Sequence, residues 1–91
     1  MIHIVRTTEK SKIEQLSHLL TQNDKVILMD DACYLLSTHY LNSIANKQVT
    51  LFALDKHVSA RNICVQENTK IIANEKLVDI LANETQSMTW Q

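Results

Sequence analysis

Residues 25–34 read Lys-Val-Ile-Leu-Met-Asp-Asp-Ala-Cys-Tyr, an apolar run that ends in two aspartates and continues into residues typical of a helix. A continuous apolar run of this kind predicts a strand that is covered on both faces of a sheet. In open α/β sheets, ligands and reactive groups lie at the carboxyl ends of such strands. The segment therefore predicts a strand followed by a helix, and Cys33 at the start of that helix is the first candidate for chemistry.

The alternation of strands and helices continues on both sides of this segment. Apolar and β-branched runs predict strands at 2–5, 26–29, 49–54, 70–73 and 87–90, the last of them at an edge of the sheet. Helical spacing of apolar residues predicts helices at 11–21, 32–45, 55–62 and from residue 74 onward. We therefore expect an α/β fold, a three-layer α/β/α sandwich with a mostly parallel sheet of four or five strands, and one domain over residues 1–91.

Polar residues precede or open the predicted helices. Ser11 and Glu14 have the spacing of a capping box, and Asp55 and Asn74 are expected to act as N-caps. The chain contains no glycine and no proline, so its turns must use Asn, Asp, Ser and Thr. The lack of glycine also excludes a standard P-loop, a dinucleotide fingerprint and a nucleophile elbow.

Composition excludes several other classes of protein. With 9 basic and 10 acidic residues and a net charge of −1, the chain lacks the basic surface that binds nucleic acid unaided. It has no apolar stretch near the roughly 20 residues that span a membrane. Two cysteines without a signal peptide predict the cytoplasm. No C-x-x-C motif and no pair of histidines at i, i+4 is present, so we expect neither a metal nor a cofactor.

Two interpretations of Cys33 remain open. The start of a helix activates a thiol, which suggests a nucleophile or sulfur carrier. Alternatively, the side chain packs in the core as a small apolar group. Asp30 and Asp31 favour packing, because nearby negative charges raise the pKa of a thiol, and the simplest role of these aspartates is to cap the following helix. A thiol enzyme that uses Cys33 is therefore the alternative hypothesis.

The helix predicted at 32–45 is apolar around most of its circumference, and a second apolar face predicts a protein partner. The candidate interface residues of the chain are Tyr34, Tyr40, Leu41, Arg61 and Trp90. For Arg61, the alternative is a cation that simply stabilises the end of a helix. For Trp90, burial in a partner and burial against its own sheet both remain open.

Several short motifs follow one another in a recognisable order. They are Ile2-His3-Ile4-Val5, then Lys25 to Asp31, then Val49-Thr50-Leu51-Phe52-Ala53-Leu54-Asp55, then Ala60-Arg61, and the Met88-Thr89-Trp90 ending. In this order and total length the chain resembles the TusB/DsrH family of small sulfur-relay subunits. The similarity extends over essentially the whole sequence.

The resemblance implies a compact α/β/α fold and a heterohexamer with TusC-like and TusD-like paralogues. Such a complex passes persulfide sulfur from a TusA-like donor toward a TusE-like acceptor, and the sulfur ends as the 2-thio group of wobble uridine in tRNA. The sulfur-carrying cysteine belongs to the TusD-like subunit. DsrH-like relatives carry a cysteine on the first helix where this chain has Leu16, which favours tRNA thiolation over sulfur oxidation. We therefore expect a noncatalytic subunit of a sulfurtransferase complex.

Overall fold

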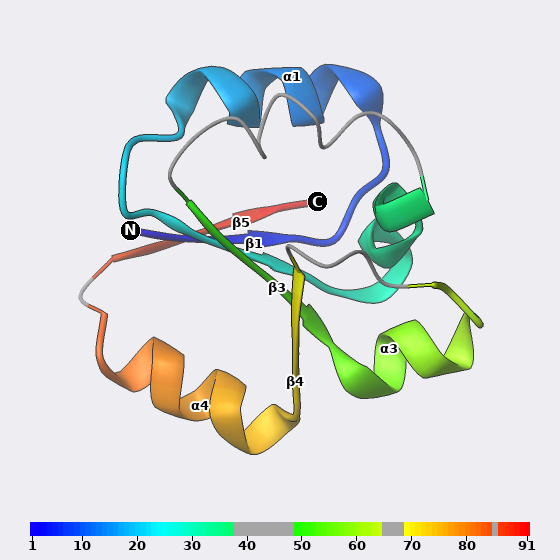
Figure 1. Ribbon diagram of the computed structural model, residues 1–91. Helices are drawn as coiled ribbons and strands as arrows, with labels where there is room; N and C mark the ends of the chain where they lie inside the picture. Colours follow the sequence, from blue (N-terminus) through cyan, green and yellow to red (C-terminus); the bar gives the residue numbers. More distant parts are fainter. Residues whose placement is uncertain (38–48, 65–68, 85) are drawn as a thin grey trace.

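A computed structural model describes residues 1–37, 49–64, 69–84 and 86–91 of the protein. These residues form a five-stranded parallel sheet with the strand order β4-β3-β2-β1-β5 (Figure 1). The strands are β1 (Ile2–Val5), β2 (Lys25–Leu28), β3 (Thr50–Leu54), β4 (Thr69–Ile72) and β5 (Ser87–Trp90). Parallel neighbours require a crossover between them, and a helical segment follows each of β1 to β4. The predicted α/β fold and its parallel sheet are confirmed.

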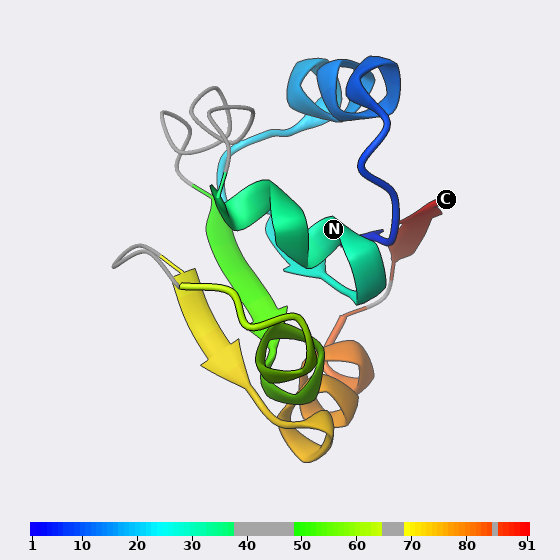
Figure 2. The same ribbon diagram turned by 90° about the vertical axis from the view of Figure 1, so that its right-hand side faces the viewer.

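The helical segments cover the two faces of the sheet. They are α1 (Lys10–Leu19), the 3-10 helix η1 (Asp30–Ser37), α3 (Asp55–Ala60) and α4 (Asn74–Ala82). Figures 1 and 2 show α1 and α4 on opposite sides of the sheet. The strand at 87–90 is found at an edge, as predicted, and it pairs with β1 at the other end of the sheet from β4.

The core consists of two apolar layers, one on each face of the sheet. One layer joins α1, η1 and α3 to the strands and includes Leu16, Leu28 and Cys33. The other joins α4 to the opposite face and includes Ile27 and Ile80. Successive residues of a strand point to opposite faces, so Ile27 and Leu28 contribute to different layers. The uninterrupted apolar run of β2 is explained by burial on both faces.

The predicted capping box of the first helix is wrong. The helix α1 begins at Lys10, its N-cap is Glu9, and no side chain caps it. Ser11 lies inside the helix, and its Oγ donates a hydrogen bond to Glu9 Oε1 over 3.3 Å. The side chain of Ser11 therefore bonds to a neighbouring carboxylate instead of to the backbone N–H of Glu14.

The N-caps predicted for the last two helices are wrong by one residue. Asp55 and Asn74 are the first residues of α3 and α4, and the N-cap positions belong to Leu54 and Ala73. Both apolar residues have extended backbone angles, as the N-cap position requires. The chain therefore turns into each helix directly from apolar sequence.

The second predicted helix differs from its predicted form. Its described part is η1, which begins at Asp30 and ends at Ser37, two residues earlier at its start than predicted. The N–H of Ala32 donates to the carbonyl of Met29 over 3.1 Å, which is the i to i+3 pattern of a 3-10 turn. The remainder of the predicted helix, with Tyr40 and Leu41, lies outside the described residues.

Asparagine and aspartate take the turn positions that glycine occupies in other chains. Asn23, Asp30 and Asn62 have φ angles of 73°, 54° and 54°, in the left-handed region. Short polar side chains of this type tolerate that region better than other residues do. The prediction that this glycine-free chain turns with Asn and Asp is confirmed at these three positions.

Candidate functional site

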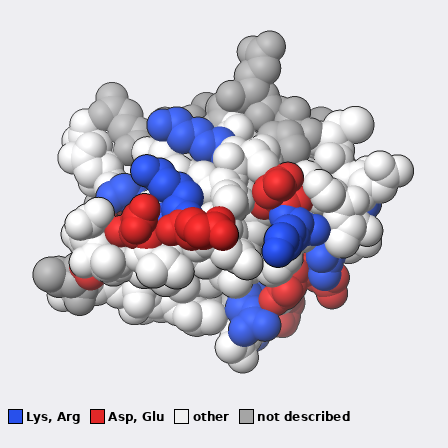
Figure 3. Space-filling model, turned by 90° about the horizontal axis from the view of Figure 1, so that it is seen from below, with Lys and Arg blue, Asp and Glu red and all other residues white. Residues whose placement is uncertain are grey.

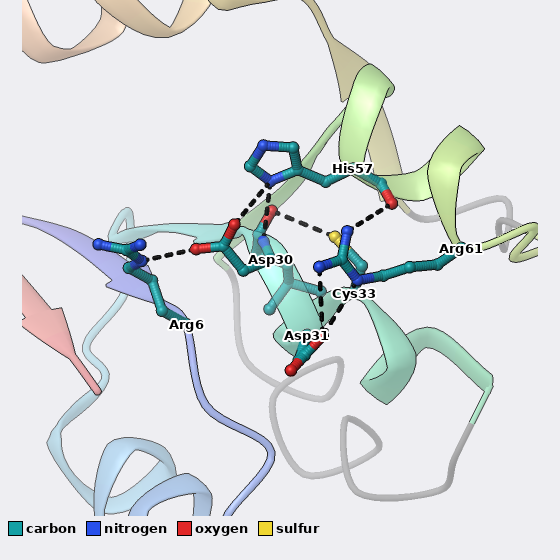
Figure 4. Close-up of polar contacts among 7 residues, drawn as sticks. Arg6, Asp30, Asp31, Cys33, His57 and Arg61 are labelled. Atoms are coloured by element: carbon teal, nitrogen blue, oxygen red, sulfur yellow. Dashed lines mark hydrogen bonds and ion pairs between the residues drawn. The ribbon is translucent and has the colours of Figure 1, made fainter.

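Polar side chains from three neighbouring strands meet at the carboxyl edge of the sheet. Arg6 follows β1, Asp30 follows β2, and His57 lies in the first turn after β3. Arg6 Nε donates to Asp30 Oδ2 over 2.7 Å, and the N–H of Asp30 donates to His57 Nδ1 over 2.8 Å (Figure 4). The sheet order β3-β2-β1 places these three chain segments side by side, so the contacts follow directly from the topology.

Asp30 is the centre of this group. Its hydrogen bond from Arg6 lowers the pKa of its carboxyl group, and the charges of Arg6 and Arg61 add to this effect although partial burial opposes it. Because His57 Nδ1 accepts the N–H of Asp30, this nitrogen carries no proton in the structure and Nε2 carries it. The left-handed φ of Asp30 is held in place by contacts on both its side chain and its backbone.

Asp31 binds a different arginine. Arg61 Nε and Nη2 both lie 3.2 Å from Asp31 Oδ1, and Arg61 Nη1 donates to the carbonyl of His57 over 3.2 Å. The guanidinium carbon of Arg61 also lies 5.9 Å from the centre of the Tyr34 ring. The two adjacent aspartates therefore diverge, as expected for neighbouring carboxylates, and they bind two different arginines. Both lie in the first turn of η1, where a negative charge stabilises the start of a helix.

Cys33 lies beneath these charged groups. Its side chain is 0% exposed within the core layer of η1, and its Sγ lies 3.6 Å from the carbonyl oxygen of Leu28. Burial raises the pKa of the thiol, the charges of Asp30 and Asp31 raise it further, and the charge of Arg61 offsets part of the increase. A buried thiol that resists ionisation is a poor nucleophile, so the geometry favours packing over catalysis.

The two thiols are expected to react at very different rates with a disulfide reagent such as DTNB. Cys64 is exposed and Cys33 is buried, so Cys33 can react only after the core opens. We expect it to be slower by at least about a hundredfold, the population cost of a local opening of a few kcal/mol. The measurement is the time course of absorbance from the thiolate that DTNB releases when it reacts with the native protein.

Single variants assign the two phases of this reaction. Cys64→Ser should remove the fast phase, and Cys33→Ser should leave it unchanged. A fast phase that disappears in Cys33→Ser would show that the Cys33 thiol is accessible, and it would revive the thiol-enzyme hypothesis.

A second polar group lies in the core, and the sequence patterns did not indicate it. The indole Nε1 of Trp90 donates to His3 Nδ1 over 3.3 Å, and His3 Nε2 lies 3.3 Å from Asp24 Oδ2. His3 is on β1, Asp24 directly precedes β2, and Trp90 ends β5. The signal available in the sequence is that His3 and Trp90 belong to strands, and Asp24 directly precedes a strand, which a parallel sheet can place side by side.

The structure brings together two of the predicted interface residues. Tyr34 is 45% exposed and lies against Arg61. Trp90 is half-buried and packs against the core layer of its own chain, while Tyr40 and Leu41 lie outside the described residues. Sequence reasoning missed Arg6 and His57, although both follow a strand end and the carboxyl-edge rule could have identified them.

The described residues offer little for a metal or a small ligand. Among them there is no group of three His, Cys, Asp or Glu side chains that could hold a metal ion, and they enclose no pocket. In this part of the chain no helix is long and apolar enough to cross a bilayer. On the face seen in Figure 3, acidic and basic side chains lie next to one another, unlike the one-sided basic surface typical of nucleic-acid binding.

Comparison with known proteins gives concordant results. Residues 7–87 match the family model described as DsrH like protein. A protein named TusB from Yersinia enterocolitica (serotype O:8 / biotype 1B) is 27% identical over 82 residues, with 86% of each chain covered. A second protein named TusB, from Buchnera aphidicola subsp. Baizongia pistaciae, is 25% identical over an alignment of 95 residues in length, with 99% of this chain and 100% of the relative covered.

The fold is also found in a solved structure. The crystal structure of the ychN protein from E. coli superposes with a TM-score of 0.69 over 98% of this chain and 97% of that chain. At 14% sequence identity this likeness supports the architecture alone. Because the family model spans most of the sequence, from the turn after β1 to the start of β5, the chain belongs to the DsrH-like protein family.

Proposed function

We propose that the protein is a noncatalytic subunit of a cytoplasmic sulfur-relay complex. In this complex it binds TusC-like and TusD-like paralogues, and the assembly passes persulfide sulfur from a TusA-like donor toward a TusE-like acceptor. The sulfur ends as the 2-thio group of wobble uridine in tRNA. Membership of the DsrH-like family and similarity to two proteins named TusB support this proposal.

The burial of Cys33 is the observation that carries the noncatalytic role. A sulfur carrier needs an accessible thiolate that attacks the outer sulfur of a donor persulfide and releases the donor as a thiolate. The outer sulfur of the new persulfide must then be open to attack by the thiolate of the next carrier. The Cys33 thiol is enclosed by the core, and both burial and the neighbouring aspartates raise its pKa. The alternative, in which Cys33 carries the sulfur, requires the core around η1 to open at every transfer.

The surface formed by Asp31, Tyr34 and Arg61 is the part of the described structure best suited to bind a partner subunit. Tyrosine and arginine are enriched among residues that contribute most to binding energy. Arg61 is fixed by Asp31 and by the carbonyl of His57, so little side-chain freedom is lost when a partner packs on it. The exposed Tyr34 ring supplies apolar area beside this fixed charge.

Replacing Tyr34 with alanine is expected to weaken assembly with the TusC-like and TusD-like paralogues by about tenfold or more, as for an interface residue of above-average contribution. The measurement is native mass spectrometry of the three co-expressed chains over a dilution series. Val78→Ala is the matched control, because Val78 is 64% exposed but lies on α4, on the other face of the sheet.

Two outcomes would contradict the proposal. If the wild-type chain forms no complex with either paralogue, the interaction role fails. If the complex forms with Cys33→Ser in place but tRNA thiolation is lost, as measured by nucleoside mass spectrometry, the subunit takes part in the chemistry. If Tyr34→Ala and Val78→Ala assemble equally well, Tyr34 does not contribute to binding. The proposed binding surface would then be wrong, but the proposed function would stand.

A further inference from the structure

His3 connects two strands through opposite edges of one buried imidazole ring. The ring is 2% exposed on β1, which lies between β2 and the edge strand β5. Its Nδ1 lies 3.3 Å from the indole Nε1 of Trp90 on the edge strand β5, and its Nε2 lies 3.3 Å from Asp24 Oδ2 at the start of β2. The centres of the two aromatic rings are 6.4 Å apart, with planes inclined by 35°.

The partners of the ring determine its protonation. An indole N–H only donates, so His3 Nδ1 must accept and cannot carry a proton. The hydrogen of the neutral ring therefore resides on Nε2 and points to the carboxylate of Asp24. This arrangement uses both nitrogens of the neutral imidazole, each in a different role.

The ring also has apolar neighbours among the described residues. Its neighbours in the sheet are Val26 on β2 and Met88 on β5, and the core layer on this face also contains Leu16 of α1 and Leu20, the residue that follows α1. Among the described contacts, charge reaches the ring from the carboxylate of Asp24. The charged group that faces Asp24 in turn is the α-amino group of Met1, at 3.3 Å.

We propose that His3 is a proton-operated latch that holds the indole of Trp90 while the ring is neutral and releases it when Nδ1 takes up a proton. In the imidazolium both nitrogens donate, so Nδ1–H would face the N–H of Trp90, donor against donor. Asp24 holds the charged ring in place through Nε2, so the indole moves and the imidazole stays. The edge strand β5 pairs with β1 alone among the described strands, which makes it the least restrained strand on this side.

Tryptophan fluorescence tests the latch directly, because Trp90 is the single tryptophan of the chain. Histidine side chains change charge between about pH 8 and pH 5. Over this range we expect the emission of the wild-type protein to shift to the red and to lose intensity along one sigmoidal curve. Constant emission of the wild-type protein across the range would overturn the proposal.

His3→Gln is the informative variant. Its side-chain oxygen can accept the indole N–H and its amide can donate to Asp24, but it does not titrate, so we expect a spectrum that stays constant with pH. His18→Gln is the matched control, since His18 lies exposed on α1. The tryptophan emission of this variant should change with pH as it does in the wild-type protein. If the emission of His3→Gln changes with pH in the same way as that of the wild-type protein, the proposal is overturned.

A second measurement does not depend on the folding of His3→Gln. NMR of the His3 ring in wild type and in Trp90→Phe compares the two titration midpoints. The indole bond stabilises the neutral ring alone, so its loss should raise the midpoint by about 0.5 to 1 pH unit, the equivalent of an ordinary hydrogen bond. Identical midpoints would show that protonation and the Trp90 contact are not coupled.

Discussion

Replacing Leu16 with alanine is expected to lower the free energy of unfolding by about 2 to 5 kcal/mol, the range measured when a buried leucine is truncated in a well-packed core. Leu16 is 0% exposed on α1 and belongs to the core layer that joins this helix to β1 and β2. A chain of 91 residues has a small core and a total stability of about 5 to 15 kcal/mol. The measurement is urea denaturation followed by circular dichroism.

Leu19→Ala is the matched control for this prediction. Leu19 belongs to the same helix but is 54% exposed, so the same substitution should cost no more than about 0.5 kcal/mol. Equal losses in the two variants would mean that the cost comes from helix propensity and not from the core. It would also contradict the packing of α1 on the sheet.

The burial of Leu16 also bears on the expectation, drawn from the resemblance, that DsrH-like relatives carry a cysteine at this position. In this chain, the side chain at position 16 points into the layer between α1 and the sheet. Position 16 is therefore a packing position in this protein, in keeping with the proposed noncatalytic role.

The elements that could be predicted from sequence are those with a strong local pattern. The apolar runs at 26–29 and 49–54 predicted β2 and β3, and burial on both faces explains why these runs do not alternate. Helix starts were predicted less well. At α3 and α4, polar residues typical of caps lie one residue inside the helix, because the extended end of the preceding segment occupies the cap position.

The contacts of the candidate sites depend on which strands become neighbours, and local patterns do not contain that information. Arg6 and Asp30 are 24 positions apart in the sequence, and His3 and Trp90 are 87 apart. The pairing of β5 with β1 requires the chain to cross the sheet after β4. Once the strand order is given, the carboxyl-edge rule recovers the contact between Arg6 and Asp30, and it leaves the contact of His3 with Trp90 unpredicted.

The sequence favoured packing of Cys33 in the core, but it indicated only the smaller of the two causes that raise the pKa of this thiol. The sequence favoured packing because Asp30 and Asp31 repel a thiolate. In the structure these charges do raise the pKa of the thiol, but burial is the larger cause. Sequence alone cannot indicate burial at the first turn of a helix, because exposed and enclosed positions there share the same residue types.

Replacing Asp24 with asparagine is expected to lower the free energy of unfolding at neutral pH by about 2 to 4 kcal/mol, the cost of breaking buried hydrogen bonds to a charged group. The carboxylate of Asp24 accepts hydrogen bonds from the N–H of Thr21 at 3.1 Å and from the α-amino group of Met1 at 3.3 Å, and it also binds His3. The amide nitrogen of asparagine would place a donor against one of these donors. Asp79→Asn on the exposed side of α4 is the matched control, with an expected change within about 0.5 kcal/mol.

This contribution of Asp24 should depend on pH in a defined direction. Burial alone would raise the pKa of its carboxyl group, but the hydrogen bonds from Thr21, from the α-amino group of Met1 and from His3 outweigh it, so the folded-state pKa lies below the ordinary value of 3.8. A group of this kind stabilises the fold above its unfolded pKa, and the stabilisation is lost as the pH falls from 3.8 toward the folded value. The difference in unfolding free energy between wild type and Asp24→Asn should therefore be largest above about pH 5 and shrink below about pH 4. A difference that grows on acidification would mean that the carboxyl group is protonated more readily in the folded protein than in the unfolded chain, which the hydrogen bonds around Asp24 do not allow.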